Sequence, residues 1–587
     1  MIREKAADLV VFGKIFTAEK EGNGLCGAFA VKDGKYIYAG DRDGAADYID
    51  EGRTKIIDNT GKGLIIPGCT EGHGHFIGID AVARMMPGYY MHYDGLLDLI
   101  REKMTAEEKP EYFLSWGLDY QIFMEKTGTD RNYAEEIESA APDIPVVLID
   151  SGGHQALCNQ TALKIAGLDN GKKVRGGDIR LTSGGVPNGV ISDEVIPYVI
   201  ERTIDLSKVD AEIYRTACSN AVDTLHERGF TNYYDAYINC MGGPIWYPYL
   251  KDMDDSGELG INVTTTYTVR SYEAEEYREK IDYMIEEGNK YRTTHFNPLV
   301  LKLFSDGVVE ARTGWTIGKY PGAKPGQEHG NIVWSPDELK EIAAYANSKG
   351  IPIHTHTFGD GACRAVIDAY INAEEKSGKK LHNTLAHVRN ITDEDIRRCA
   401  EHDIGIAGNL LWHCMDVSAL SQKQRSSKPG FLSKICKSVE CWIKLMIIKS
   451  YFPRGIFESG YPMKSLVDSG ITVSSSTDAP CAEFIKGNIQ NIIEVAVTGT
   501  APGDDARPYN PGELLSIREV LNCLTIDGAR QLGIDDRCGS VKEGKNADFV
   551  ILDTDFLDFT GADLRTIHNT KIQNVYFEGK EVYRAEQ

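Results

Sequence analysis

The sequence is short of positive charge and has no long hydrophobic run. It contains 64 Lys and Arg residues against 87 Asp and Glu, a formal net charge of -23. Nucleic acids and anionic membranes attract basic surfaces, so this balance argues against both as partners. No segment approaches the roughly 18 apolar residues of a membrane span, and the first residues, MIREKAADLVVFGKIF, lack the apolar stretch of a signal peptide. We therefore expect a cytoplasmic protein.

The cysteines are not arranged for disulfides or for a structural zinc site. The 13 cysteines are scattered along the chain, and none is part of a Cys-x-x-Cys pair. This pattern argues against a disulfide framework and against a zinc finger. We expect reduced thiols, most of them buried.

Two β-rich ends surround a repeating middle. Residues 1–66 and 535–587 alternate apolar and polar positions between turn residues, which predicts short strands and a small β-sandwich domain built from both ends. Between them, eight short apolar runs alternate with helix-like segments such as SPDELKEIAAYANSKG and TDEDIRRCAEHD, which open with Ser or Thr as N-caps. This α/β pattern predicts a (β/α)8 TIM-like barrel over residues 67–534, with a large insertion at about 77–215 after the first strand.

Polar residues stand at the ends of five predicted barrel strands, and a barrel brings such ends together at one mouth. In chain order they are His73 and His75, Lys302, His354 and His356, His387, and Asp478. Residues two apart on a strand face the same side, so His73 and His75 can bind one ion. Imidazole and carboxylate ligands suit zinc and similar divalent ions. Lys302 is costly inside an apolar strand unless something neutralises or uses it.

Each of these signals has an ordinary structural explanation when it is taken alone. A His-x-His pair can be a core or surface pair, and a lysine near a strand end can extend to solvent. An Asp before Ala-Pro is often a turn residue. The order of the residues on five strands of one predicted barrel is what favours a metal site.

The chain resembles the metal-dependent amidohydrolase superfamily, and more narrowly the branch with YtcJ-like amidohydrolases and N-substituted formamide deformylases (amidohydrolase family 3). The resemblance is carried by segments that include IIPGCTEGHGHF, LKLFSDGVVEARTG, IHTHTFGD, STDAP and GSVKEGKNADFVILD. One mild departure is Thr477, where the family usually has serine.

The resemblance implies a site with one or two divalent metal ions, zinc first. His73 and His75 would bind one ion, and His356 and His387 the second. A carboxylated Lys302 would bridge the two, with His354 in a supporting role. Asp478 would contact the first ion and act as general base and acid.

The reaction that the resemblance implies is hydrolysis of a non-peptide C–N bond in an amide, formamide or cyclic amide. The metal lowers the pKa of a bound water, and Asp478 takes its proton and passes it to the leaving amine. Alternatives are a hydrolytic deaminase of a small ring compound and a metal-dependent isomerase or lyase on the same barrel. A non-catalytic metal-binding assembly protein is disfavoured because every expected ligand is present.

Several residues are candidates for substrate binding. They lie just beyond Lys302, in SWGLDY and GGHQAL of an expected lid, and in LWHCMD after the seventh strand: Asp306, Glu310, Thr313, Trp116, Asp119, His154 and His413. A buried core position for Trp116 and a merely solvated loop after Lys302 are the alternatives. Asp360 is expected to support the site or to cap a helix.

Residues 418–457 form a basic stretch in an otherwise acidic chain, with eight Lys or Arg residues and the single acid Glu440. The family pattern is not recognisable there. We expect a solvated surface loop, with an inserted lid that attracts an anionic substrate as the alternative. A homodimer is the default expectation for the oligomeric state.

Overall fold

The computed structural model describes most of the chain. The described residues are 6–19, 21–85, 91–119, 121–124, 131–238, 244–309, 312–323, 325–414, 452–480, 485–505, 508 and 510–586. Glu310 and residues 418–451 of the basic stretch lie outside them, so the expectations for these residues stay predictions.

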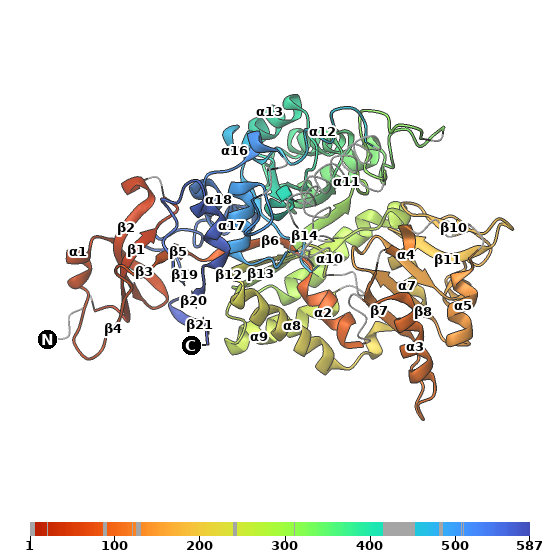
Figure 1. The fold of residues 1–587 in the computed structure, drawn as a ribbon, viewed down its shortest axis with the longest axis horizontal. Coiled ribbons are helices and arrows are strands. Elements are labelled where there is room, and N and C mark those ends of the chain that lie inside the picture. Colours follow the sequence, from red (N-terminus) through yellow and green to blue (C-terminus); the bar gives the residue numbers. More distant parts are fainter. Residues whose placement is uncertain are drawn as a thin grey trace, which may run out of the picture.

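Eight parallel strands form the centre of the molecule (Figure 1). In hydrogen-bonded order they are β6 (Cys69–Gly74), β12 (Phe230–Asp235), β13 (Asn262–Thr268), β14 (Phe296–Phe304), β15 (Ile353–Thr357), β16 (Thr384–His387), β17 (Gly405–Gly408) and β18 (Val473–Ser475). Past the end of β18, the Asp478 N–H donates to the His73 carbonyl and the His75 N–H to the Ala479 carbonyl, both at 2.8 Å. These bonds join the last strand to the first at the rim of a barrel.

Amphipathic helices surround this barrel. They are α8 (Ala211–Glu227), α9 (Tyr247–Ser256), α10 (Tyr277–Tyr291), α11 (Pro336–Ser348), α12 (Asp360–Ser377), α13 (Asp393–His402), α16 (Met463–Asp468), α17 (Ile489–Thr498), α18 (Ile517–Leu524) and α19 (Ile526–Gln531). Helix α11 begins after Ser335, which forms a capping box with Glu338, and α13 begins after Thr392, whose side chain accepts from the Asp395 N–H. Both helix starts agree with the Ser and Thr caps predicted from the sequence.

Strands from the two chain ends share one sheet beside the barrel, at the left of Figure 1. Its members are β1 (Leu9–Phe16), β2 (Leu25–Lys32), β3 (Lys35–Gly40), β4 (Lys55–Asp58), β5 (Leu64–Pro67), β19 (Phe549–Leu552), β20 (Ile572–Phe577) and β21 (Lys580–Arg584), with helix α1 (Arg42–Ala46). Val550 of β19 pairs with Ile66 of β5 in antiparallel register. Phe29 and Phe549, from opposite chain ends, pack with ring centroids 5.0 Å apart in one core.

A third sheet, of five strands, is formed by the residues between β6 and β12. Its order is β10 (Ile179–Leu181), β11 (Pro187–Ser192), β9 (Gln155–Cys158), β8 (Val146–Asp150) and β7 (Phe113–Leu118). The helices of this region are α2 (Phe76–Met85), α3 (Tyr93–Met104), α4 (Gln121–Met124), α5 (Tyr133–Ala140), α6 (Gln160–Ile165) and α7 (Val195–Thr203). We call this region the insertion. Arg175 of the insertion contacts a barrel helix, because Arg175 Nη1 donates to Glu338 Oε1 of α11 at 2.7 Å.

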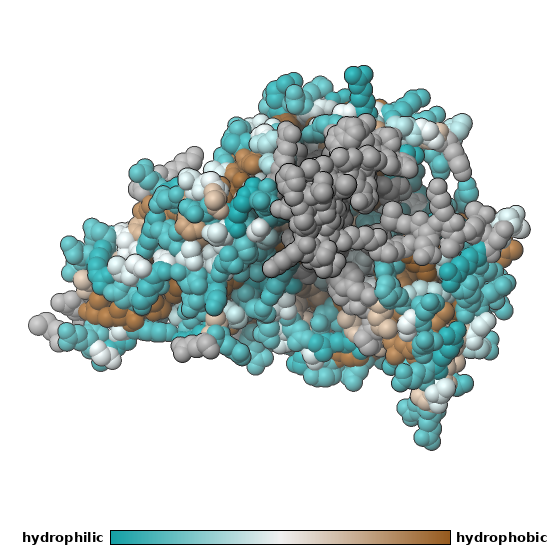
Figure 2. Space-filling model, in the orientation of Figure 1, coloured by the Kyte–Doolittle hydropathy of each residue, from teal (hydrophilic) through white to brown (hydrophobic). Residues whose placement is uncertain are grey.

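The predicted fold class is confirmed: a TIM-like barrel with a β-sandwich domain from both chain ends and an insertion after the first barrel strand. The exact domain limits stay predictions. The face seen in Figure 2 is mainly hydrophilic, with hydrophobic residues in small separate patches. Among the described residues, no helix combines the length and the apolar character that a membrane crossing requires.

Candidate active site

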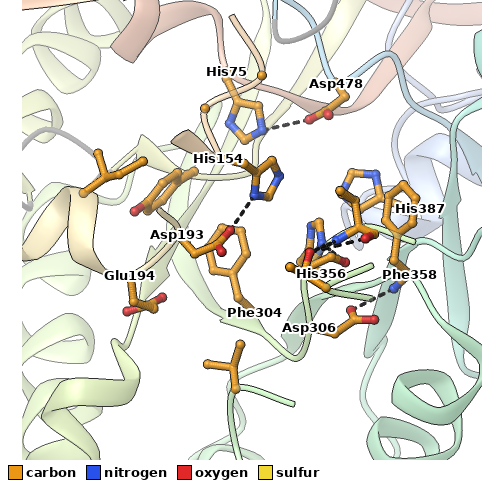
Figure 3. Close-up of a pocket in the computed structure, with 18 of the residues that line it drawn as sticks. His75, His154, Asp193, Glu194, Phe304, Asp306, His356, Phe358, His387 and Asp478 are labelled. Carbon is orange, nitrogen blue, oxygen red and sulfur yellow. Dashed lines mark hydrogen bonds and ion pairs between the residues drawn. The ribbon is translucent and has the colours of Figure 1, made fainter. Parts of the chain in front are cut away.

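A cavity of about 290 Å³ opens at the carboxyl ends of the barrel strands. The barrel contributes His73, His75, Lys302, Phe304, Asp306, His356, His387 and Asp478 to its walls, and the insertion contributes Trp116, Ile149, His154, Asp193, Glu194 and Ile196. Figure 3 shows the histidines and acids of both groups around this space. The cavity thus combines mostly apolar walls with a few polar side chains, as small-molecule sites do.

Two buried histidines and the half-buried Asp478 are close enough to share a metal ion. One ligand atom each from His73, His387 and Asp478 lies within 4.8 Å of the other two. Asp478 Oδ1 lies 3.4 Å from His73 Nε2 and 3.0 Å from His75 Nε2. His387 and Asp478 have φ values of 73° and 61°, which non-glycine residues seldom adopt. Such backbone conformations concentrate at functional sites.

The charge state of Asp478 follows from its neighbours. Burial alone would raise the pKa of its carboxyl, but the hydrogen bond to His75 and the charges of nearby imidazoles hold the pKa below its ordinary value. Burial lowers the pKa of His387 to about 4 and that of His73 well below its ordinary value. Neutral imidazoles beside a carboxylate are the ligand forms that a divalent ion requires.

Two buried polar side chains hold these groups in place. Asn409 Oδ1 lies 2.8 Å from His387 Nδ1, so the other ring nitrogen is left for the cavity. Glu71, also buried, accepts the His73 N–H at 3.1 Å, the Thr477 N–H at 2.9 Å and the Thr477 hydroxyl at 2.8 Å. Thr477 therefore makes a hydroxyl contact that serine could also make. Glu71 was not foreseen, since a single acid inside a strand gives no spacing signal.

Lys302 and His354 lie side by side on β14 and β15. The Lys302 ammonium nitrogen is fully buried and has no hydrogen-bond partner among the described residues. Burial lowers its pKa to about 7. His354 Nε2 lies 2.8 Å from His73 Nδ1, which fits the supporting role predicted for His354. The His356 and His387 rings have centroids 4.6 Å apart, so these two expected ligands also adjoin.

The predicted substrate residues divide into two groups. Trp116, His154, Asp306 and Thr313 line the cavity. Asp306 is held by the backbone, because its carboxylate accepts N–H groups of Trp315, Phe358 and Gly359, each at 2.9 Å. The Thr313 hydroxyl accepts the Val308 N–H at 3.0 Å. Their contacts with substrate stay predictions.

Asp119 and His413 are not among the described residues that line the cavity. Asp119 Oδ2 lies 3.1 Å from His92 Nδ1, and His413 Nε2 donates to the Tyr461 carbonyl at 2.8 Å. Trp412, the neighbour of His413, lines the cavity instead. Asp360, outside the wall, accepts the Ile317 N–H at 2.8 Å, which supports the adjacent loop.

Two cavity-lining acids of the insertion, Asp193 and Glu194 in the segment GVPNGVISDE, were not predicted from the sequence. His154 Nδ1 lies 2.9 Å from Asp193 Oδ1. Burial alone would lower the pKa of His154, but this hydrogen bond and the charges of Asp193 and Asp150 raise it to about 8. The insertion therefore adds ionisable groups to the cavity wall.

Comparisons with known proteins show the family and the fold of this chain. The model of the amidohydrolase family matches residues 55–583 of this chain. The putative amidohydrolase YtcJ of Bacillus subtilis is 22% identical over 97% of this chain and 98% of its own length. The N-substituted formamide deformylase of Arthrobacter pascens is 21% identical over 89% of each chain. An uncharacterized metal-dependent hydrolase from Pyrococcus horikoshii has the same fold, with a TM-score of 0.66, 20% identity and coverage of 94% and 98%. The resemblance seen in the sequence is confirmed.

Proposed function

The chain belongs to the amidohydrolase family, and we propose that it is a metal-dependent hydrolase that cleaves a non-peptide C–N bond in a small amide, formamide or cyclic amide. The proposal rests above all on the approach of His73, His387 and Asp478 within 4.8 Å at the cavity. The name of the formamide deformylase relative and the small size of the cavity support the substrate class.

The residues present fit divalent metal. Two neutral imidazoles and a carboxylate match zinc in ligand type and number. The buried, unpartnered Lys302 nitrogen is otherwise hard to explain, because burying a polar group without a partner is costly. Carboxylation by carbon dioxide would convert this amine into an anionic oxygen ligand. We therefore propose that a carboxylated Lys302 would help to hold two ions, one together with His73 and His75 and the other together with His356 and His387.

The chemistry divides between the metal and the chain. Bound divalent metal would supply Lewis acidity and an activated water. Asp478 is ionised at neutral pH and sits at the mouth of the barrel, so it can accept a proton and return it to the leaving nitrogen. Trp116 and Phe304 present apolar surface to the cavity, where they would hold the substrate and exclude water.

The first test is metal content after purification without added metal, in the wild type and in Lys302→Ala. We expect about two ions in the wild type, falling to one or none in the variant. Lys545→Ala is the matched control, because Lys545 is also buried but donates to the Cys538 carbonyl far from the cavity. About one ion in the wild type, unchanged in Lys302→Ala, would remove Lys302 from the site and leave a mononuclear enzyme.

The second test is amine release from N-formyl amines, N-acyl amines and cyclic amides. Activity that a chelator abolishes and zinc restores supports the proposal, whereas ammonia release from ring compounds alone would favour the deaminase. A small-molecule substrate, a homodimer and a cytoplasmic location remain our proposals. Size-exclusion chromatography with light scattering would test the oligomeric state.

A further inference from the structure

The insertion gives the cavity a second polar region, in which Glu194 lies on the side away from His387 and Asp478, whereas the His154 ring centroid lies 5.9 Å from that of His356 (Figure 3). It is formed by His154, Asp193 and Glu194 of the insertion. Asp193 is paired with His154, and its N–H donates to the His154 carbonyl at 3.0 Å. This pair leaves Glu194 as the acid whose role the fold does not explain.

The Glu194 side chain is almost fully buried yet incompletely bonded. The residue is 6% exposed, and its Oε2 has no hydrogen-bond partner among the described residues. The Ser271 N–H donates to this carboxylate. Glu194 occupies the N-cap position of α7 but makes no capping bond with its side chain. The carboxylate therefore does not serve the helix, and an unmade bond in a buried site costs stability.

The surrounding chain leaves room for this carboxylate. A Cβ on Gly176 would lie 2.7 Å from Glu194 Cγ and 2.5 Å from Ser271 Oγ. Gly176 has a φ of 79°, a conformation natural to glycine. Any residue other than glycine at position 176 would therefore displace the Glu194 side chain.

Arg270 is the nearest counter-charge to Glu194, but no hydrogen bond is seen between the two among the described residues, and Arg270 Nε and Nη2 also lack hydrogen-bond partners there. It is buried, hydrogen-bonds the Tyr237 hydroxyl, and has its Nε 3.8 Å from Glu201 Oε1. Burial raises the pKa of Glu194 to about 7 even though the charge of Arg270 opposes that rise. His154 is likewise committed to Asp193. With Asp193, Glu194 and Glu201 against His154 and Arg270, the group carries an excess negative charge when all are ionised.

We infer that Glu194 forms a subsite for a cationic nitrogen of the substrate, such as a protonated amine, at the end remote from the bond that is cleaved. The inference rests on the proposed hydrolase function and narrows its substrate class to amides that carry a basic group. The metal ligands on one wall and the acid on the other would orient such a substrate along the apolar middle of the cavity. The net charge of -23 also favours the approach of cations.

The test is calorimetric binding of n-alkylammonium ions and n-alkanols of equal chain length at about pH 8. The two probes of each pair differ in charge at one end only. A series of chain lengths is used because the distance between Glu194 and the apolar walls that would hold the alkyl chain is not known. We expect the wild type to bind the best ammonium probe on the order of 10-fold or more tightly than its alkanol, as a buried charge-assisted hydrogen bond implies. Glu194→Gln should abolish this preference.

Glu138→Gln is the matched control, since Glu138 is an acid of the insertion that hydrogen-bonds Thr161 and is not among the described lining residues. It should keep the preference. Removing a buried, unpaired charge should not lower the thermal unfolding temperature, so Glu194→Gln should fold. Equal wild-type affinities for the two probe types, or a preference that survives Glu194→Gln, would overturn the inference.

Binding and hydrolysis separate the two proposals. An ammonium preference that depends on Glu194, without hydrolysis of any amide, would leave the subsite standing and refute the hydrolase. Hydrolysis of neutral amides without any ammonium preference would support the hydrolase and refute the subsite.

Discussion

Replacing Glu71 should disturb both stability and metal affinity, although this residue does not line the cavity. Its carboxylate joins strand β6 to the loop after β18 by accepting the His73 N–H and both donors of Thr477. His73 and Asp478 are thereby positioned from the two sides of the barrel closure. Glu71→Ala would leave these donors buried without a partner.

The magnitude follows from the bonds lost. Each of the two backbone N–H groups left unpaired costs about 1–3 kcal/mol, and the truncated side chain adds a cavity cost of about 1 kcal/mol. The hydroxyl of Thr477 can rotate toward another acceptor, so it adds little. We expect a loss of about 3–7 kcal/mol in stability, together with a loss of about 10-fold to 100-fold in metal affinity, as is typical for groups that orient ligands.

The assay compares Glu71→Ala with Glu494→Ala. Glu494 is equally buried and accepts the Gly503 N–H at 2.6 Å and the His568 N–H at 2.7 Å, but it lies in α17, outside the described cavity wall. Both variants should lower the temperature of half-inactivation, a suitable measure for a multidomain chain. Only Glu71→Ala should weaken zinc binding in competition with a chelator. Equal zinc affinity in the two variants would refute the positioning role of Glu71.

Two further predictions concern the ionisable groups of the cavity. Asp478→Asn should lower kcat by on the order of 10²–10⁴-fold, because Asn cannot accept the proton but can keep the contact with His75; a loss below about tenfold, measured by amine release, would assign the proton transfer elsewhere. His154 has a pKa raised from 6.5 to about 8, so the stability that its protonated form contributes is fully present below about pH 6.5 and is lost as the pH rises through 8. The thermal unfolding temperature of the wild type should therefore fall as the pH rises between these values, and it should change less in Asp193→Asn. Identical slopes of unfolding temperature against pH in the two proteins would contradict the assignment to this pair.

The barrel and its ligand order could be predicted because both depend on simple periodic signals. Parallel strands covered on both faces appear as short apolar runs, such as the one around Lys302, and β14 is indeed mostly buried. Barrel topology then gathers the strand ends, so His73, His387 and Asp478 meet whatever the details of their loops. These inferences need no knowledge of side-chain direction within the loops.

The remainder of the site depends on packing that no local pattern encodes. Asp119 follows strand β7 but pairs with His92, and His413 donates to the Tyr461 carbonyl while its neighbour Trp412 lines the cavity. Glu71 meets a partner 406 positions away in the sequence. Such contacts depend on how the insertion and the barrel closure pack, so they cannot be predicted from the spacing of residues in the sequence.

The division of the cavity between barrel and insertion separates the proposed chemistry from the proposed recognition. Of the metal-binding candidates, His73 and His387 stand on barrel strands β6 and β16, and Asp478 follows β18, where its N–H donates to the His73 carbonyl. Glu194 and Trp116 come from the insertion. A change in the insertion can therefore alter which molecule is bound while the strand-held ligands stay in place, which is how one fold supports different substrates. On this reasoning, Glu194 should influence the choice of substrate, and Asp478 the rate at which any bound substrate reacts.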